Sequence, residues 1–224
     1  YTSSVHAIPE QPGGGVMREI SEFAPEKIVG YYGKSKAMAS QVVMDAVREQ
    51  GLDATIVFPS GLCGPQDYAY GYVTQLLIDS AGGKLPAGAK GGYNFADVRD
   101  VAAGVVAACS KGKKGETYIL GNRYVPVEEI MQYVHEETGA RLVKRMVPVG
   151  LARLFLPAFT LYYKARGRRP LFTRYSLYTL TSNSNFSLEK ATRELGYKVR
   201  PFRETIGDAL KWLKAEGKIS LRLA

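Results

Sequence analysis

The chain has 224 residues, 46% of them hydrophobic and 23% charged, which is enough for a sizeable buried core in one large or two small domains. Its cysteines (Cys63, Cys109) and histidines (His6, His135) show no paired spacing, which argues against a disulfide scaffold or a metal site and fits a reducing, cytoplasmic location. The net charge of +9 is compatible with an anionic substrate or an acidic membrane surface, but no nucleic-acid-binding module accompanies it.

Strands and helices alternate along the chain, as the apolar runs and the glycine and proline punctuation indicate. In chain order we expect the end of a strand at 1–5, a loop at 8–15, a helix at 31–50, a strand at 54–58, a loop at 60–67, a helix at 72–81, a strand at 93–96, a helix at 101–109, a strand at 117–120, a helix at 126–139, a strand at 142–147, and helices at 187–196 and 203–215. Gly51 is expected to end the first helix in a left-handed conformation, and Asp100 and Ser187 to cap two later helices. This alternation favours an α/β fold with parallel strand pairing.

The strongest chemical signal is the run Tyr32-Gly33-Lys34-Ser35-Lys36 in the first predicted helix. Tyr32 and Lys36 are four residues apart, so they lie on one face of that helix. A free tyrosine hydroxyl releases its proton reluctantly at neutral pH, and a nearby ammonium favours the phenolate. Such a pair can serve as acid or base for a carbonyl and its alcohol. An isolated pair is more often an ordinary exposed helix face, so the neighbouring motifs decide its meaning.

Four further motifs accompany this pair. They are Thr2-Ser3-Ser4 at an expected strand end, 28 residues before the tyrosine, then Val57-Phe58-Pro59-Ser60-Gly61-Leu62-Cys63-Gly64-Pro65, Phe95-Ala96-Asp97-Val98-Arg99-Asp100-Val101-Ala102 and Glu189-Lys190-Ala191-Thr192-Arg193-Glu194-Leu195-Gly196-Tyr197. In this order and spacing the chain resembles the extended short-chain dehydrogenase/reductase family, most closely its dihydroflavonol-reductase-like and 3β-hydroxysteroid-dehydrogenase-like branch. The resemblance covers nearly the whole chain and is specific for the superfamily, not for a substrate.

The resemblance implies a role for each motif position. Tyr32 would be the general acid or base, Lys36 would favour its phenolate and bind the nicotinamide ribose, and Ser4 would hydrogen-bond the substrate oxygen. Ser3 takes the place of Ser4 if the alignment slips by one residue. The residues expected to lie against the nicotinamide of NADP or NAD are Pro59, Ser60, Gly61 and Leu62, the alternative being an ordinary connecting loop.

Departures from the family pattern argue against two of the reactions that the family carries out. Dehydratases of this family usually carry an acidic pair where Val5 and His6 stand, and sugar epimerases usually carry Tyr-Gly near 7–9. His6 lies two residues after Ser4, so on a strand the two would share a face and His6 would contact the substrate. The alternative is a structural histidine with its hydrogen bonds satisfied.

The glycine-rich turn that holds the coenzyme pyrophosphate in this family does not appear before Ser4. Gly13, Gly14 and Gly15 neither follow a strand nor open a helix, so they do not replace it. We therefore expect the adenine and pyrophosphate half of the coenzyme site to be absent here. Either a separate polypeptide carries the N-terminal half, or the sequence is part of a longer one.

A change of character near 121–126 divides the chain in this interpretation. Residues 1–121 would form a partial Rossmann-type catalytic domain, and residues 122–224 a smaller, mainly helical substrate-binding region. The helix at 31–50 carries apolar residues on more than one side, which fits either a homodimer or burial against further strands.

Aromatic and basic residues mark the second region. Tyr163 and its aromatic neighbours predict either an apolar substrate pocket or plain core packing. The basic residues between 164 and 169 fit an anionic group on the substrate or a solvated loop. The apolar stretch 146–163 is too short and too interrupted to span a bilayer, so it predicts a lid, core or a peripheral lipid contact over 151–163.

The leading hypothesis is an NAD(P)-dependent oxidoreductase that transfers hydride between nicotinamide and a carbonyl or secondary alcohol. The alternatives are an enzyme like the nucleotide-sugar epimerases and a non-catalytic fragment or binding protein without its own coenzyme site.

Overall fold

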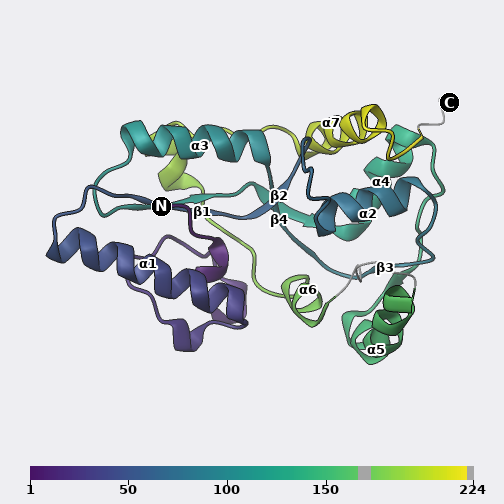
Figure 1. Cartoon of the computed structure of the whole chain (residues 1–224), viewed down its shortest axis with the longest axis horizontal. Coiled ribbons are helices and arrows are strands. Elements are labelled where there is room, and N and C mark those ends of the chain that lie inside the picture. The colour runs from purple at the N-terminus through teal and green to yellow at the C-terminus, as the bar shows by residue number, and fades with distance from the viewer. Residues whose placement is uncertain (166–172, 221–224) are drawn as a thin grey trace. The chain divides into compact units, whose positions relative to one another are not determined.

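The computed structural model describes residues 1–165 and 173–220. They form two compact units, each assembled from three stretches of the chain. The first unit comprises Tyr1–Leu62, Asn94–Tyr124 and Asn183–Arg200, and the second comprises Cys63–Tyr93, Val125–Ser182 and Pro201–Ala224. Figure 1 shows the ribbon of the chain with its elements labelled.

Parallel strands form the centre of the first unit. Strand β1 (Ile56–Pro59) pairs in parallel with β5 (Thr117–Leu120), and every residue of both strands is buried. On the other side of β1, the N-terminal residues add a third parallel stretch, in which Ser3 N donates to Val57 O over 2.8 Å. Continuous apolar strands of this kind are typical of parallel sheets covered on both faces. All three stretches have their carboxyl ends at the same edge.

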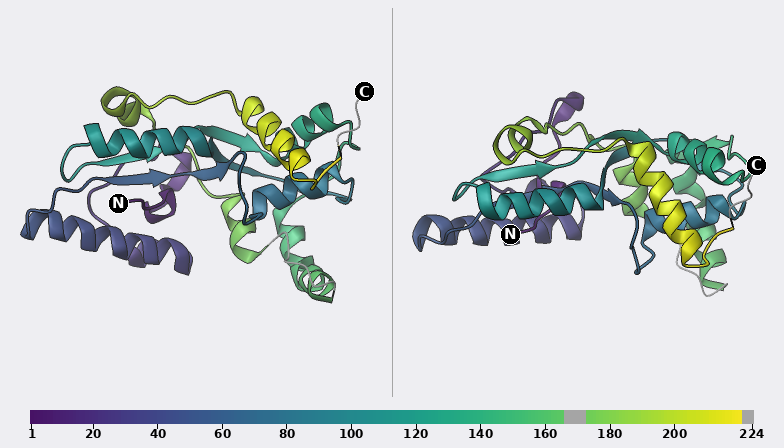
Figure 2. Two further views of the ribbon diagram at one scale, coloured as in Figure 1. Left: turned by 45° about the horizontal axis from the view of Figure 1, so that its top comes forward. Right: turned by 90° about the horizontal axis from the view of Figure 1, so that it is seen from above.

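Helices α3 (Val98–Lys111) and α1 (Tyr31–Glu49) lie on opposite sides of these strands, as Figures 1 and 2 show. The core beside α3 consists of buried side chains from β1, β4, β5 and α3 and from residues 191–197: Val57, Ala96, Val101, Ala108, Tyr118, Leu120, Ala191, Leu195 and Tyr197. At Gly104 a Cβ would lie 2.9 Å from the Leu120 side chain and 3.0 Å from that of Tyr197. Only glycine permits this close packing of α3 on the strand.

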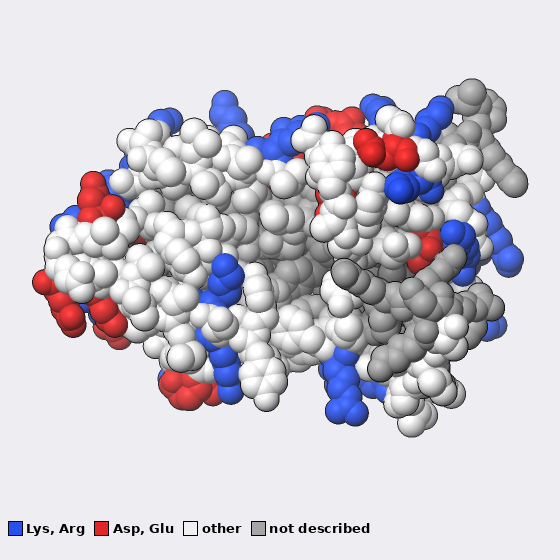
Figure 3. Space-filling model, in the orientation of Figure 1, with Lys and Arg blue, Asp and Glu red and all other residues white. Residues whose placement is uncertain are grey.

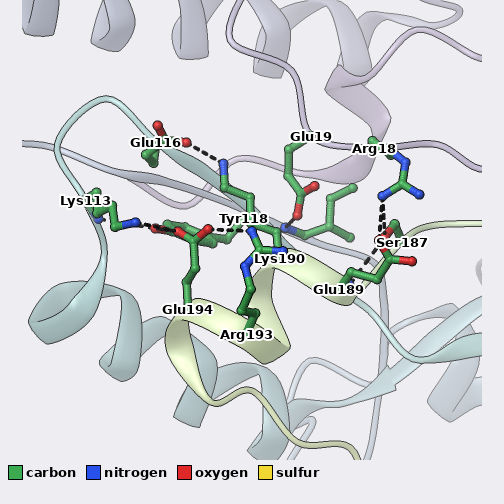
Figure 4. Close-up of polar contacts among 11 residues, drawn as sticks. Arg18, Glu19, Lys113, Glu116, Tyr118, Ser187, Glu189, Lys190, Arg193 and Glu194 are labelled. Carbon is green, nitrogen blue, oxygen red and sulfur yellow. Dashed lines mark hydrogen bonds and ion pairs between the residues drawn. The ribbon is translucent and has the colours of Figure 1, made fainter.

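A network of charged and hydroxyl groups holds the C-terminal segment of the first unit to β5 (Figure 4). Lys190 bridges to Glu116 over 2.5 Å, and the Tyr118 hydroxyl donates to Glu194 over 3.1 Å. From the long connection before α1, Glu19 accepts a hydrogen bond from the backbone N–H of Ile119. The network therefore fixes that connection and satisfies a backbone donor of β5.

Helix α3 begins three residues earlier than predicted, and Asp100 does not cap it. The cap is Asp97, which ends strand β4 and accepts a hydrogen bond from Arg99 N over 2.8 Å. Asp100 lies in the first turn and instead forms an ion pair with Arg200, 100 residues away, over 2.7 Å. The prediction failed because a tertiary partner outweighed the local capping preference of this aspartate.

Three further boundaries in this part of the chain differ from the prediction. Strand β1 begins at Ile56, and the N-terminal strand ends before Val5, where the 3₁₀ helix η1 (Val5–Ala7) begins. The segment 60–67, predicted as a loop, contains the short strand β2 (Gly61–Cys63). Gly51 has a φ of 72°, as predicted, and Ser187 accepts a hydrogen bond from Glu189 N ahead of the π-helical turn η4 (Ala191–Leu195).

A three-stranded sheet has the order β2-β4-β6, with β4 at Gly92–Asp97 and β6 at Arg123–Pro126. The chain passes between the two units within each of these strands. One of these passages, from Tyr124 to Val125, falls inside the predicted boundary at 121–126.

The second unit is mainly helical. Its helices are α2 (Tyr72–Ala81), α4 (Val127–Thr138), α5 (Val149–Ala165), α6 (Arg174–Thr179) and α7 (Phe202–Ala215). Its own strands, β3 (Gly88–Ala89) and β7 (Met146–Val147), form a short parallel pair, so only the end of the strand predicted at 142–147 is present. Pro126 and Gly139 bound α4 as predicted, the glycine with a φ of 64°. Across the described ranges, no helix is both long and apolar enough to cross a membrane.

Candidate active site

Tyr32 and Lys36 occupy the first two turns of α1. The Tyr32 side chain is 51% exposed, and Gly30, with a φ of 85°, leads the chain into the helix ahead of it. The ammonium of Lys36 donates a hydrogen bond over 3.1 Å to the carbonyl of Thr2 and lies 5.7 Å from the ring centroid of Tyr1. The lysine is therefore held at the carboxyl end of the N-terminal parallel stretch, next to the two serines.

The two serines have different surroundings. Ser3 Oγ lies 2.7 Å from Ser40 Oγ of α1, and Ser40 in turn donates to the carbonyl of Lys36 over 2.8 Å. The hydroxyl of Ser3 is thus used in binding α1. Ser4 is also buried, and its Oγ accepts a 3.3 Å hydrogen bond from His6 N within the described residues, which leaves its hydroxyl proton for another acceptor.

His6 lies in η1 and not on a strand, so the expected sharing of one strand face with Ser4 is wrong. The cause is Ser4 itself, because its side chain caps η1 and turns the backbone away from the extended conformation. The His6 ring meets the Tyr32 ring edge-on, with 5.8 Å between ring centroids. Burial lowers the pKa of His6 to about 4, so the imidazole is neutral at physiological pH.

Gly33 sets the distance between α1 and η1. A Cβ at Gly33 would lie 2.6 Å from the carbonyl oxygen of His6 and 2.6 Å from the Ile28 side chain. Any larger residue would push the start of α1, and Tyr32 with it, away from Ser4 and His6. No role was predicted for Gly33 or Ser40 from the sequence, although Ser40 follows Lys36 by one helical turn and so lies on the same helix face.

The predicted nicotinamide loop follows β1 at the same edge of the strands. Pro59 is the last residue of β1, and Ser60 N donates to Leu120 O over 3.1 Å. Gly61 lies where a Cβ would be 2.8 Å from the Phe95 ring, and Leu62 is 45% exposed. Ser60 is 8% exposed, and its Oγ is a buried oxygen that lacks a hydrogen-bond partner within the described residues.

The structure thus brings Ser4, His6, Tyr32 and Lys36 to the carboxyl end of the N-terminal stretch and places Pro59 and Ser60 at the same end of β1. Ligand sites in open α/β sheets lie at the carboxyl ends of the strands. The side chain of Tyr163 lies outside the described residues. Over the described part of the chain, no three histidine, cysteine or acidic residues are grouped to hold a metal ion.

A family model described as the NAD dependent epimerase/dehydratase family matches residues 1–121, more than half of the chain. The chain belongs to this family. Its description names a nicotinamide coenzyme, as the motif order predicted, and the parallel α/β architecture agrees with it.

Relatives confirm the predicted branch. The chain is 30% identical over 226 residues to sterol demethylase protein B of Methylococcus capsulatus, covering 98% of this chain and 67% of the relative. It is 30% identical over 223 residues to a putative dihydroflavonol 4-reductase of Synechocystis, covering 98% and 65%. A 3β-hydroxysteroid-dehydrogenase/decarboxylase of Arabidopsis thaliana is 27% identical, with 97% and 54% covered.

Among solved structures, that of gox2253 superimposes with a TM-score of 0.81 at 31% identity, covering 98% of this chain and 67% of that one. The chain therefore spans about two thirds of the length of the first of these relatives.

The residues present fit the nicotinamide and ribose end of NAD(P). Tyr32 and Lys36 provide a hydroxyl and an ammonium from one helix face, and the unpartnered, buried Oγ of Ser60 is a polar group that a ligand can satisfy. The three glycines at 13–15 do not fit the pyrophosphate end. They form the short turn η2 (Pro12–Gly14) and its C-terminal neighbour, neither after a strand nor at the start of an α-helix.

Proposed function

We propose that the protein is an NAD(P)-dependent reductase or dehydrogenase that interconverts a carbonyl compound and a secondary alcohol. The observation that carries this proposal is the placement of Ser4, Tyr32 and Lys36 at one carboxyl edge of the parallel strands. The coenzyme, when bound, supplies or accepts the hydride. The chain's own residues would manage the proton and orient the substrate.

Tyr32 would exchange the proton. As the carbonyl is reduced, its hydroxyl gives a proton to the substrate oxygen, and it takes the proton back in the reverse direction. Its half-exposed position at the start of α1 leaves the phenol accessible. Lys36 supports this role because a fixed ammonium on the same helix face stabilises the phenolate that remains. The hydrogen bond from Lys36 to Thr2 O limits where the ammonium can move.

Ser4 would donate its hydroxyl proton to the substrate oxygen and hold it next to Tyr32. Ser3 is the weaker candidate, because the contact with Ser40 already engages its hydroxyl. Pro59, Ser60, Gly61 and Leu62 would lie against the nicotinamide. The role of Ser60 in this loop is supported by its unsatisfied hydroxyl.

The proposal extends to parts of the protein outside this site. Residues 1–121 would be the catalytic domain and residues 122–224 the substrate-binding region, with Tyr163 among the substrate contacts. Met38 and Val42 are 60% and 68% exposed on α1 and support a homodimer through that helix. Within the described residues Cys63 and Cys109 form no disulfide, which is consistent with a cytoplasmic location.

The experiment is Tyr32→Phe, with Tyr31→Phe as the matched control. Tyr31 is the adjacent residue of the same helix and is 94% exposed. We expect Tyr32→Phe to lower kcat by at least about 10²-fold, the usual contribution of a positioned general acid, and Tyr31→Phe to leave it unchanged. A Tyr32→Phe enzyme that reduces its carbonyl substrate at the original rate would refute the assigned mechanism.

A coenzyme titration tests whether this polypeptide binds NAD(P)H unaided. NADH and NADPH are added separately to the 224-residue chain, and nicotinamide fluorescence is followed, with Lys36→Met compared with Lys34→Met. Because these residues fit only the nicotinamide and ribose end of the coenzyme, we expect weak binding that Lys36→Met weakens further and Lys34→Met does not. If neither coenzyme binds, the activity proposed here requires residues beyond these 224, from the same or a second polypeptide.

A further inference from the structure

The outward face of α5 is apolar. Leu151, Leu154, Phe155 and Leu161 are 47%, 71%, 51% and 70% exposed, and their spacing of three, four and seven residues places them on one side of the helix. The opposite side is the packed one, where Val149 and Leu156 are buried in a cluster of the second unit that includes Leu177.

This distribution differs from that of an ordinary surface helix, because the exposed side is apolar as well as the packed side. A helix that packs on one face normally presents polar residues on the other, and a helix that is apolar all round is buried or in contact with lipid. The four exposed side chains of α5 form an apolar stripe along one side of the helix, and exposed apolar patches mark interaction surfaces. All four residues of the stripe lie on α5, so the partner is inferred from this helix and from the charged residues near it in the sequence.

The excess of positive charge lies in the sequence segment that contains this helix. Between Gly139 and Leu188 the sequence has nine basic residues and no acidic residue, which equals the chain's entire net charge of +9. The basic residues are Arg141, Lys144, Arg145, Arg153, Lys164, Arg166, Arg168, Arg169 and Arg174. Over α5, the described surface visible in Figure 3 shows uncharged and basic side chains without an acidic one.

We propose that α5 is a docking surface for an anionic lipid bilayer, on which the helix lies in the membrane plane with its apolar stripe among the headgroups and upper acyl chains. A helix with apolar residues on one side, set in a basic segment, has the composition of interfacial helices. The basic residues complement anionic headgroups, while the exposed leucines and Phe155 require an apolar layer just beneath. With 17 residues and an internal Pro157, α5 fits this position and not a spanning one.

Other occupants match only one of the two features. Nucleic acid complements the basic residues but offers no apolar layer for Leu154 and Leu161. An apolar protein groove would match the stripe, but it would leave the positive charge of the basic residues uncompensated. The bilayer surface is the partner that satisfies both, and this inference does not depend on the proposed reaction.

Flotation with lipid vesicles tests the proposal. The protein is mixed with vesicles of phosphatidylcholine alone, or of phosphatidylcholine with phosphatidylglycerol, at low and at high salt. We expect flotation with the anionic vesicles at low salt, weaker flotation at high salt because salt screens the basic residues, and none with the neutral vesicles. Absence of flotation with the anionic vesicles would overturn the proposal.

Matched variants separate the apolar contribution from simple charge attraction. The double variant Leu154→Gln/Leu161→Gln should reduce the partition coefficient at least about tenfold, because two exposed leucines no longer enter the apolar layer. The double control Leu52→Gln/Val106→Gln changes two residues of the first unit that are 46% and 69% exposed, and it should float like the original protein. Circular dichroism checks that each variant is folded.

Two results would overturn the proposal while leaving the proposed reaction untouched. One is undiminished flotation of the leucine variant, which would reduce the membrane contact to charge alone. The other is tight binding of a DNA duplex that persists in the leucine variant while anionic vesicles do not compete for it, which would make the basic segment a nucleic-acid surface. Because flotation uses neither coenzyme nor substrate, it fails or succeeds independently of the reductase assay.

Discussion

The ring of His6 stands edge-on to the ring of Tyr32, at 5.8 Å between centroids and an interplanar angle of 75°. Through its backbone N–H, His6 also holds Ser4 Oγ. One residue thus touches both groups that would face the substrate oxygen. We expect the His6 ring to orient Tyr32 through this edge-on packing, which another aromatic ring could provide.

We therefore expect His6→Phe to keep kcat within about threefold, whereas His6→Ala lowers kcat about tenfold because Tyr32 loses the ring that orients it. Steady-state kinetics with the two variants check this, and the KM for coenzyme should be the same in both. If His6→Phe raises the KM for the carbonyl substrate as much as His6→Ala does, His6 is a substrate contact instead.

The lowered pKa of His6 also predicts a pH dependence of stability. The folded pKa of about 4 lies below the ordinary value of 6.5, so between these values the unfolded chain binds more protons than the folded one. The free energy of unfolding must then fall as pH falls through this window, by up to about 3 kcal/mol. Urea denaturation between pH 4 and pH 7 should show that His6→Phe flattens this slope and that His135→Gln does not.

The contact between Ser3 and Ser40 predicts a loss of stability without a specific loss of chemistry. Ser40→Ala leaves the buried hydroxyl of Ser3 without its partner, which costs about 1–3 kcal/mol. Ser4→Ala should instead abolish turnover at a smaller cost in stability, because it removes only the 3.3 Å capping hydrogen bond from His6 N. Chemical denaturation and kcat measured on both variants give the comparison. Equal losses of turnover in the two would mean that Ser3 and Ser4 cannot be assigned different roles.

Arg200 is expected to be a structural residue of the first unit. It pairs with Asp100 over 2.7 Å and with the fully buried Asp97 over 3.5 Å, so Arg200→Met leaves buried negative charge less compensated. We expect the free energy of unfolding to fall by about 2 kcal/mol. The loss is limited to this size because Arg99 also pairs with Asp97. The control is Arg18→Met, whose ion pair with Glu189 is exposed on both sides and should contribute little. Similar melting temperatures for both variants would contradict this.

Local patterns in the sequence were sufficient where the cause was local. The i, i+4 spacing of Tyr32 and Lys36, the apolar run of β1 and the glycine after α1 each depend on a few neighbouring residues, and each was predicted. The family and its nicotinamide coenzyme followed from the order of the motifs. The roles of the individual site residues, the homodimer and the domain division stay predictions.

Where the structure differs from the predictions, a partner distant in the sequence determines the local structure. Asp97 and Asp100 are both able to cap α3, and the choice between them depends on Arg200, 100 residues later in the chain. Likewise, the glycines of the 60–67 segment favoured a loop, but pairing with β4 makes Gly61–Cys63 a strand. Ser3 and Ser4 differ only through Ser40 and the turn at His6, and neither contact can be read from two adjacent serines.

The passage of the chain through β2, β4 and β6 limits how this protein can be dissected. Each unit needs three separated stretches of sequence, so cutting the polypeptide once, even between Tyr124 and Val125, would divide both units and isolate neither. Neither unit can be completed on the ribosome before the other is largely synthesised, because the last stretch of the first ends at Arg200. We therefore expect the two units to fold together, and a single substitution in β2, β4 or β6 to disturb both.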